Sequence, residues 1–264
     1  PRADGHLQAV GVDEAGRTQY RYHEEWSRRA SAEKFDRALR LADVLPRVRA
    51  GVTRDLRGDG LSRARVLAGA FRLIDEALLR VGGERYARER GTVGLATLRV
   101  RHVEISGSVV TLAFPGKSGE RWERAIDDPD LAALVAELTD RGPRSHLLSW
   151  RDDDGWHPLR SAGITADVRE RAGLDATAKD LRTLRGTAIA ARSLAKAGPA
   201  HTDAERRSAL AQAARDAADA LGNTPSVARS SYIDPRVADR FERGAVVDPG
   251  SLAHVERQLP GFLG

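Results

Sequence analysis

The segment between residues 179 and 235 constrains the fold most tightly, because its pattern sets out successive helices with defined ends. Helical periodicity covers Lys179–Lys196, and an alanine-rich helical pattern follows from about Thr202 to Leu221. Gly222 ends that pattern, as glycine commonly does at a helix C-terminus. We expect these helices to belong to a mainly helical domain.

A short helix is expected to follow and to end at Tyr232. Thr224 before Pro225 is typical of an N-cap residue with proline at the first helical position. Asp234-Pro235 then turns the chain away. The sequence thus presents a phenol at the end of a short helix, nine residues after Asn223. A single tyrosine at such a place more often packs in the interior than reacts, so other residues must decide its role.

The remaining patterns predict an α+β chain that is mainly α. Helical periodicity begins at Ser31, Pro46 is expected to interrupt or restart the helix, and Ser62 can cap a third helix. Another helix is expected from Asp128-Pro129 to Thr139. After about Arg243 the composition indicates loop and weak helix, so this tail is expected to be loosely ordered.

Alternation of apolar and polar residues predicts a three-stranded antiparallel sheet. The three alternating segments are Leu95–Ser106, Val109–Phe114 and Arg121–Ile126. The turn Pro115–Gly119 places Lys117 at a hairpin tip, where a lysine is usually just solvated. Its Gly-Lys-Ser sequence lacks the first glycine of a phosphate-binding loop and lies between strands, so we reject nucleotide binding.

Residues 1–28 are expected to be the remnant of a β-rich N-terminal domain, and residues 29–264 one larger domain. The first part predicts a hairpin too short to bury a core alone. The chain begins with proline and contains no methionine, so a fragment or processed form is expected. Tyr20, Tyr22 and Trp26 lie among arginines, which suits nucleic-acid contact, although a solvated strand edge explains the pattern equally well.

The composition favours a polyanion as partner and excludes several kinds of site. The net charge is +5, and 39 of the 43 basic residues are arginine, whose forked guanidinium suits phosphate. The chain has no cysteine, so disulfides and thiolate metal sites are excluded and a reducing compartment is expected. Its seven histidines lack the spacing of a metal site. No apolar run approaches the roughly 18 residues of a membrane span.

Attack of Tyr232 on a phosphodiester would need several other groups. The phenol has a reference pKa near 10, so it needs a base or strong positive charge nearby. Two arginines can neutralise the pentavalent phosphorane, a lysine ammonium can protonate the leaving oxygen, and a neutral amide can donate one more hydrogen bond. The chain offers Arg80, Arg182, Lys117 and Asn223 for these roles. Physical chemistry alone does not select them from so many arginines.

The order of five motifs resembles that of the small type IB DNA topoisomerases of the bacterial, poxvirus-like kind. These motifs are QYRYH at 19–23, LLRVGGERYARERGTVGLATLRVRHVEIS at 78–106, FPGKSG at 114–119, KDLRT at 179–183 and LGNTPSVARSSYIDP at 221–235. The resemblance runs from about Gly5 to about Arg243. The catalytic residues that it implies are Arg80, Lys117, Arg182, Asn223 and Tyr232. The DNA-contacting residues that it implies are Gln19, Tyr20, Tyr22, Tyr86 and Lys179.

By the same resemblance, the fold would be the helical catalytic domain of the tyrosine recombinase and topoisomerase IB type. The implied enzyme clamps duplex DNA, cleaves one strand through a 3′-phosphotyrosyl bond, lets the free end rotate and reseals it, without ATP, metal or another cofactor. It is expected to be a cytoplasmic, nucleoid-associated monomer. Poxvirus members have histidine where this chain has Asn223, whereas bacterial members often have asparagine, so we expect Asn223 to act as a neutral donor.

Two alternatives stay open from the sequence. A tyrosine recombinase shares this fold and chemistry, but recombinases usually show His-x-x-Arg where this chain has Lys179 to Arg182, and Gly-His where it has Gly222-Asn223. The other alternative is an inactive DNA-binding fragment, and the complete set of candidate catalytic residues argues against it.

Overall fold

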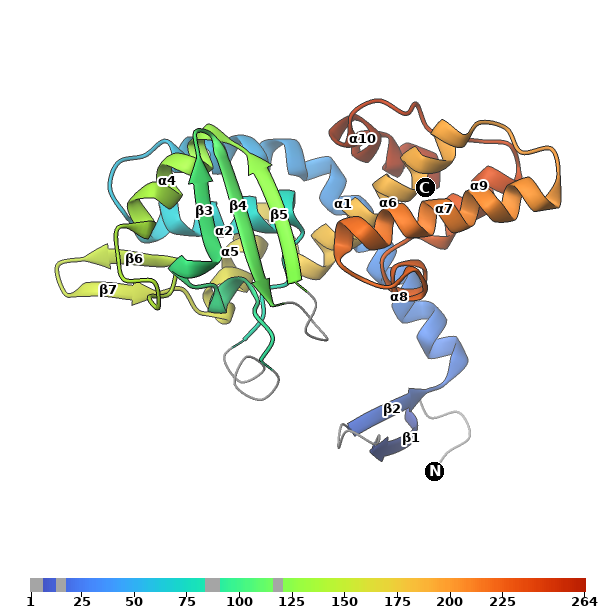
Figure 1. Ribbon diagram of the computed structural model, residues 1–264. Coiled ribbons are helices and arrows are strands. Elements are labelled where there is room, and N and C mark those ends of the chain that lie inside the picture. The colour runs from blue at the N-terminus through green and yellow to red at the C-terminus, as the bar shows by residue number, and fades with distance from the viewer. Residues whose placement is uncertain (1–6, 13–17, 84–90, 116–120) are drawn as a thin grey trace.

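The protein is mainly helical in the part that the structure describes. This computed structural model describes residues 7–12, 18–83, 91–115 and 121–264 (Figure 1). The helices are α1 (Glu24–Leu56), α2 (Arg63–Ala77), α4 (Pro129–Thr139), α5 (Ser161–Ala172), α6 (Ala178–Ala197), α7 (Asp203–Leu221), α8 (Pro225–Ser231), α9 (Pro235–Glu242) and α10 (Leu252–Leu263). The strands are β1 (Leu7–Val12), β2 (Thr18–Tyr22), β3 (Val103–Ser106), β4 (Val109–Pro115), β5 (Arg121–Asp127), β6 (Ser149–Asp152) and β7 (Gly155–Pro158).

The described strands pair antiparallel as β1–β2, β3–β4–β5 and β6–β7. The prediction of a mainly helical chain with a three-stranded antiparallel sheet is therefore confirmed. In Figure 1 this sheet lies with α2 and α4 on one side of the molecule, and α6, α7, α9 and α10 gather on the other. Helix α1 packs against members of both groups. No helix among the described residues is long and apolar enough to span a membrane.

The first helix is continuous through its proline. The expectation that Pro46 interrupts or restarts the helix is wrong, because α1 runs unbroken over 33 residues. Leu41, Leu45, Val48 and Val52 are buried on both sides of Pro46. A proline inside a helix costs roughly 3 kcal/mol, and burial of a few such side chains at about 1.5–3 kcal/mol each outweighs that cost.

The segment before the sheet is not a strand along its whole length. The alternation from Leu95 predicted a strand to Ser106, but residues 95–97 and 100–102 form 3-10 turns and β3 begins only at Val103. The amides of Leu95 and Ala96 donate to the carbonyls of residues 80 and 81 at 3.0 and 2.9 Å, not to a strand partner. Leu95 and Leu98 are buried all the same. The alternation of apolar residues therefore correctly indicated burial, but the backbone hydrogen bonds are not those of a β-strand.

The C-terminal tail is an integral helix. The expectation of a loosely ordered tail after Arg243 is wrong in the structure, because α10 buries Val255, Leu259 and Leu263 against the main core. Glu256, also on α10, is 2% exposed and accepts from Arg49 of α1 at 2.8 Å. The weak sequence pattern did not reveal these contacts because their partners lie far away in the chain.

A buried ion cluster joins four helices through side chains. Arg49 of α1 donates to both oxygens of Asp75 of α2, at 2.7 and 2.8 Å. Arg185 of α6 lies 3.2 Å from carboxylate oxygens of both Asp75 and Glu256. Two arginines and two carboxylates thus alternate in the interior, where each charge has partners of the opposite sign. The cluster fixes α10 against the end of α2 and the middle of α6.

We predict that Glu256→Ala lowers the free energy of unfolding by about 3 kcal/mol, because it leaves excess positive charge buried. Urea unfolding of the full chain measures this. Arg257→Ala is the matched control, since Arg257 is exposed on the same helix, and it should stay within about 0.5 kcal/mol of the unaltered chain. Equal effects of the two substitutions would contradict a structural role of the cluster.

Candidate active site

Arg182 is the residue around which the candidate active site is built. Helix α6 begins with a capping box, in which the amide and hydroxyl of Thr177 donate to the Asp180 carboxylate at 2.8 and 2.7 Å. Arg182 lies in the second turn and is 2% exposed. Its guanidinium donates to the carbonyl of Leu78 and, over 2.9 Å, to the carbonyl of Leu221. The buried arginine therefore ties the ends of α2 and α7 to α6.

Arg80 lies on the segment that follows α2. The sequence pattern placed it at the helix end, but α2 ends at Ala77, and Leu78 turns the chain with a left-handed φ of 55°. The carbonyl of Arg80 accepts from the amide of Leu95 over 3.0 Å. Its exposed side chain donates to Oδ1 of Asn223 and lies 3.5 Å from the Gly222 carbonyl. Arg80 and Asn223, 143 residues apart in the chain, therefore meet directly.

Asn223 follows the glycine that ends α7. Gly222 has a φ of 58°, and the Asn223 amide donates back to the last turns of α7 over 3.0 Å. A Cβ on Gly222 would lie 3.1 Å from Nε1 of Trp122 in β5. Arg124, also in β5, donates to the carbonyl of Ala220 over 2.8 Å. The sheet thus supports the chain end that carries Asn223.

Tyr232 closes α8, as the sequence predicted. The guanidinium carbon of Arg182 lies 5.0 Å from the centroid of the Tyr232 ring, in cation–π geometry. The Tyr232 carbonyl accepts from the Thr187 hydroxyl of α6 at 3.3 Å. A Cβ on Gly186 would lie 2.8 Å from that same carbonyl, so the close approach of α6 and Tyr232 requires glycine.

Two buried donors of the site have no hydrogen-bond partner among the described residues. They are Nε of Arg182 and Nδ2 of Asn223. A buried donor without a partner costs roughly 1–3 kcal/mol, so a ligand that supplies acceptors would stabilise the site. The guanidiniums of Arg80 and Arg182 add positive charge. A phosphate group provides both several oxygen acceptors and the opposite charge.

The charges of the site lower the pKa of the Tyr232 phenol. Burial raises the pKa of Tyr232, but the positive charges of Arg182, Arg80 and Lys179 together outweigh it, so the pKa lies below its ordinary value of 10.0. Burial, followed by the like charge of Arg80, lowers the pKa of Arg182 to about 10. Arg182 therefore remains a cation at neutral pH, and Tyr232 is easier to ionise than a free tyrosine.

The structure describes the side chains of only some of the other predicted residues. Lys117 and Tyr86 lie outside the described residues, and Gln19 and Tyr22 are placed only as backbone of β2. Tyr20 is 54% exposed on β2, and Lys179 is exposed on α6, one turn before Arg182. The structure thus brings together Arg80, Arg182, Asn223 and Tyr232, and Lys179 acts on the same phenol through its charge.

Among the described residues, no group of three or more His, Asp or Glu side chains could hold a metal ion.

Sequence reasoning missed two residues of α1 beside the site. Lys34 donates to the carbonyl of Ser231 over 3.2 Å. Arg37 donates to Asp180 over 3.0 Å and so holds the start of α6. The scarcity of lysine was the one available sequence signal for Lys34, but nothing local connects it with a residue 197 positions later.

The site places a tyrosine beside two arginines and an asparagine in a mainly helical fold, and comparison with known proteins gives the family. Residues 23–242 match the family described as the eukaryotic DNA topoisomerase I catalytic core. The DNA topoisomerase 1B of Acanthamoeba polyphaga mimivirus is 30% identical over 234 residues, which cover 86% of this chain and 70% of the viral protein. The chain belongs to the type IB DNA topoisomerase family, in its poxvirus-like group.

More distant relatives carry related names. The DNA topoisomerase 1B of vaccinia virus (strain Copenhagen) is 26% identical over 140 residues, or 53% of this chain and 45% of the viral protein. The DNA topoisomerase 1 of Daucus carota is 32% identical over 159 residues, or 59% of this chain and 19% of the plant protein. These relatives are viral and eukaryotic, so the bacterial origin implied by Asn223 stays a prediction.

We predict that Arg80→Gln raises the pKa of Tyr232, because it removes a positive charge that stabilises the phenolate. Tyrosine labelled with ¹³C at Cζ, followed by NMR over a pH titration, reports this pKa, and Tyr232→Phe assigns the resonance. Arg207→Gln is the control, because Arg207 is exposed on α7 and does not act on the phenol. An unchanged or lower pKa in the Arg80 variant would show that Arg80 does not act on Tyr232.

Proposed function

We propose that this protein relaxes supercoiled duplex DNA by the type IB reaction, with Tyr232 as nucleophile. The observation that carries the proposal is the pairing of a phenol of lowered pKa with two unpaired buried donors, Arg182 Nε and Asn223 Nδ2. This set is what a phosphodiester needs, because it supplies an attacking oxygen, positive charge and free hydrogen-bond donors in one place.

The reaction follows from these groups. The phenolate oxygen of Tyr232 forms a bond to phosphorus while the bond from phosphorus to the 5′ oxygen breaks, and the phenolic proton leaves to solvent. Arg80 and Arg182 neutralise the charge that grows on the non-bridging oxygens, and Asn223 donates one further hydrogen bond. Lys117 protonates the 5′ oxygen. Rotation of the free strand and the reverse attack complete the cycle. The phosphotyrosyl bond conserves the energy of the broken bond, so no nucleotide is consumed.

The N-terminal hairpin is proposed to contact the duplex. Residues 1–28 would be the remnant of a β-rich clamp domain, and residues 29–264 the catalytic domain of the tyrosine recombinase and topoisomerase IB type. Tyr20 is exposed on β2, where an aromatic face and neighbouring arginines suit DNA. Gln19, Tyr22, Tyr86 and Lys179 are proposed to join it. We expect the enzyme to act as a monomer, in the cytoplasm with the nucleoid.

The first test of function is relaxation of a negatively supercoiled plasmid in EDTA without ATP. The unaltered chain is expected to relax the plasmid and to leave a denaturation-resistant DNA adduct, and Tyr232→Phe to do neither, because the nucleophilic oxygen is gone. Ser208→Ala, which removes an exposed hydroxyl from α7, is the control for loss of a hydroxyl elsewhere. Relaxation that requires ATP or Mg²⁺, or an adduct that survives in the Tyr232 variant, would overturn the mechanism.

A second test addresses the general acid. We predict that Lys117→Ala slows single-turnover cleavage by about 10²- to 10⁴-fold, the range typical of a lost general acid. A substrate with a 5′-thiolate leaving group should restore the rate, because a thiolate leaves without protonation. Lys196→Ala, at the far end of α6, should cleave both substrates at the normal rate. Slow cleavage of the thiolate substrate by the Lys117 variant would exclude Lys117 as the acid.

A further inference from the structure

Helix α8 leads directly into the proposed nucleophile and is a short helix that packs mainly along α7. It spans seven residues, and among them, all of which the structure describes, Ala228 alone is buried. A helix this short does not form stably without external contacts. The position of Tyr232 therefore depends on what holds the two ends of α8.

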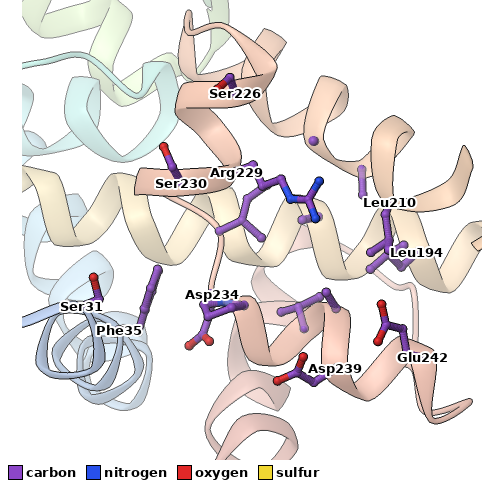
Figure 2. A pocket seen from close by; sticks show the side chains of 17 residues that line it. Ser31, Phe35, Leu194, Leu210, Ser226, Arg229, Ser230, Asp234, Asp239 and Glu242 are labelled. Atoms are coloured by element: carbon purple, nitrogen blue, oxygen red, sulfur yellow. The ribbon is translucent and has the colours of Figure 1, made fainter. Parts of the chain in front are cut away.

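One face of α8 borders a pocket of about 610 Å³. Figure 2 shows Ser226, Arg229 and Ser230 of α8 at this pocket, facing side chains of α1, α6, α7 and α9. Phe35 of α1 and Leu194 of α6 contribute apolar walls. On its other face α8 packs along α7, where Ala228 lies against Ala217 and Ala218, so the pocket side of α8 is restrained mainly by contacts at the ends of the helix.

The ends of α8 are held by specific polar contacts. At its start the Thr224 hydroxyl accepts from the Val227 amide at 3.3 Å. At its end both the Tyr232 and Ile233 amides turn back to the Ala228 carbonyl, at 2.9 and 3.1 Å. The later carbonyls of α8 then lack the next helical turn as donor. The carbonyl of Ser231, directly before Tyr232, accepts from the ammonium of Lys34 over 3.2 Å.

Lys34 is well placed for this contact because α1 is fixed on both flanks of the site. Arg37, one turn along α1, bonds Asp180 at the start of α6 over 3.0 Å. Asp36 accepts from Arg236 of α9 over 2.9 Å. The half-buried Lys34 also lies 4.0 Å from the ring centroid of Phe35. One turn of α1 thus contacts α6, α9 and the end of α8.

We propose that Lys34 is a positioning residue for the nucleophile: its ammonium caps the C-terminal end of α8 and fixes the point from which Tyr232 reaches the scissile phosphate. A cation suits this place, since the end of a helix carries partial negative charge and unpaired carbonyls. The charges that act on Lys34 are Lys179 and Asp180 of α6 and Asp234 after α8. Lys34 contacts no reacting atom in this role, which rests on the proposed function of Tyr232.

A positioning role for Lys34 and a direct contact of Lys34 with the phosphate predict different effects on cleavage and religation. In the noncovalent DNA complex the protein alone must hold the phenol in place, so loss of the cap slows cleavage. In the covalent intermediate the phosphotyrosyl bond already holds the phenol, so religation changes little. A lysine that instead touched the phosphate would stabilise the shared transition state, and its loss would slow cleavage and religation by equal factors.

The test compares Lys34→Met with Lys34→Arg and with Lys196→Met, which removes an exposed lysine from the last turn of α6. In the full chain without DNA, amide hydrogen exchange of residues 226–233 is expected to rise about tenfold in Lys34→Met, in keeping with the strength of a partly buried cation at a helix C-terminus. Lys34→Arg should restore most of the protection, and Lys196→Met should leave it unchanged.

Single-turnover assays on a nicked oligonucleotide duplex complete the test. For Lys34→Met we expect cleavage to be about tenfold slower and religation to stay within about twofold of the unaltered rate. DNA affinity, compared with and without the Lys34 substitution in a Tyr232→Phe background, should be unchanged. Normal cleavage, equal slowing of cleavage and religation, or the same loss in Lys196→Met would each overturn the proposal. If the unaltered chain forms no adduct, the proposed function fails, and unchanged exchange in Lys34→Met would separately reject the cap.

Discussion

The structure depends on one buried guanidinium, that of Arg182. Its two hydrogen bonds to the carbonyls of Leu78 and Leu221 join the ends of α2 and α7 to the interior of α6. Arg80 follows Leu78 and Asn223 follows Leu221, each two residues later in the chain. A buried charge must be surrounded by partners, so the packing of α6 against these helix ends also brings the residues of the site together. One nitrogen of this arginine has no partner among the described residues, and it can donate to a bound anion.

The site is assembled from helix ends, and this has a simple electrostatic cause. The last carbonyls of a helix have no donor in the helix itself. Arg182 uses the ends of α2 and α7, and Lys34 uses the end of α8. Arginines and lysines thus stabilise the fold through carbonyls while their positive charge gathers around Tyr232. In this member of the type IB topoisomerase family, Arg182, which completes the ends of α2 and α7, also lowers the pKa of Tyr232.

Local chemistry predicted much of this architecture. The Thr224 cap of α8 and the stop at Gly222 were confirmed, because capping depends on neighbours in the sequence. The expectation at Pro46 was wrong because the packing of α1 outweighs the local tendency of proline to break a helix. The expectation of a loosely ordered tail was wrong because Glu256 stabilises α10 in an ion cluster with residues of three other helices. Both errors arose where distant contacts, which a local pattern does not contain, decide the outcome.

The sequence by itself determined the chemical inventory: which residues are scarce, where α7 ends and α8 begins, and, through the order of its motifs, that Tyr232, Arg80, Arg182 and Asn223 belong together. Only the tertiary structure decided how they meet. It left Arg182 Nε and Asn223 Nδ2 without partners in the described part of the chain, and it brought Lys34 to a carbonyl 197 residues away. The physical reason is that hydrogen bonding and burial depend on distance through space. A sequence fixes the available donors and acceptors, and packing of the whole chain selects which of them remain free for a ligand.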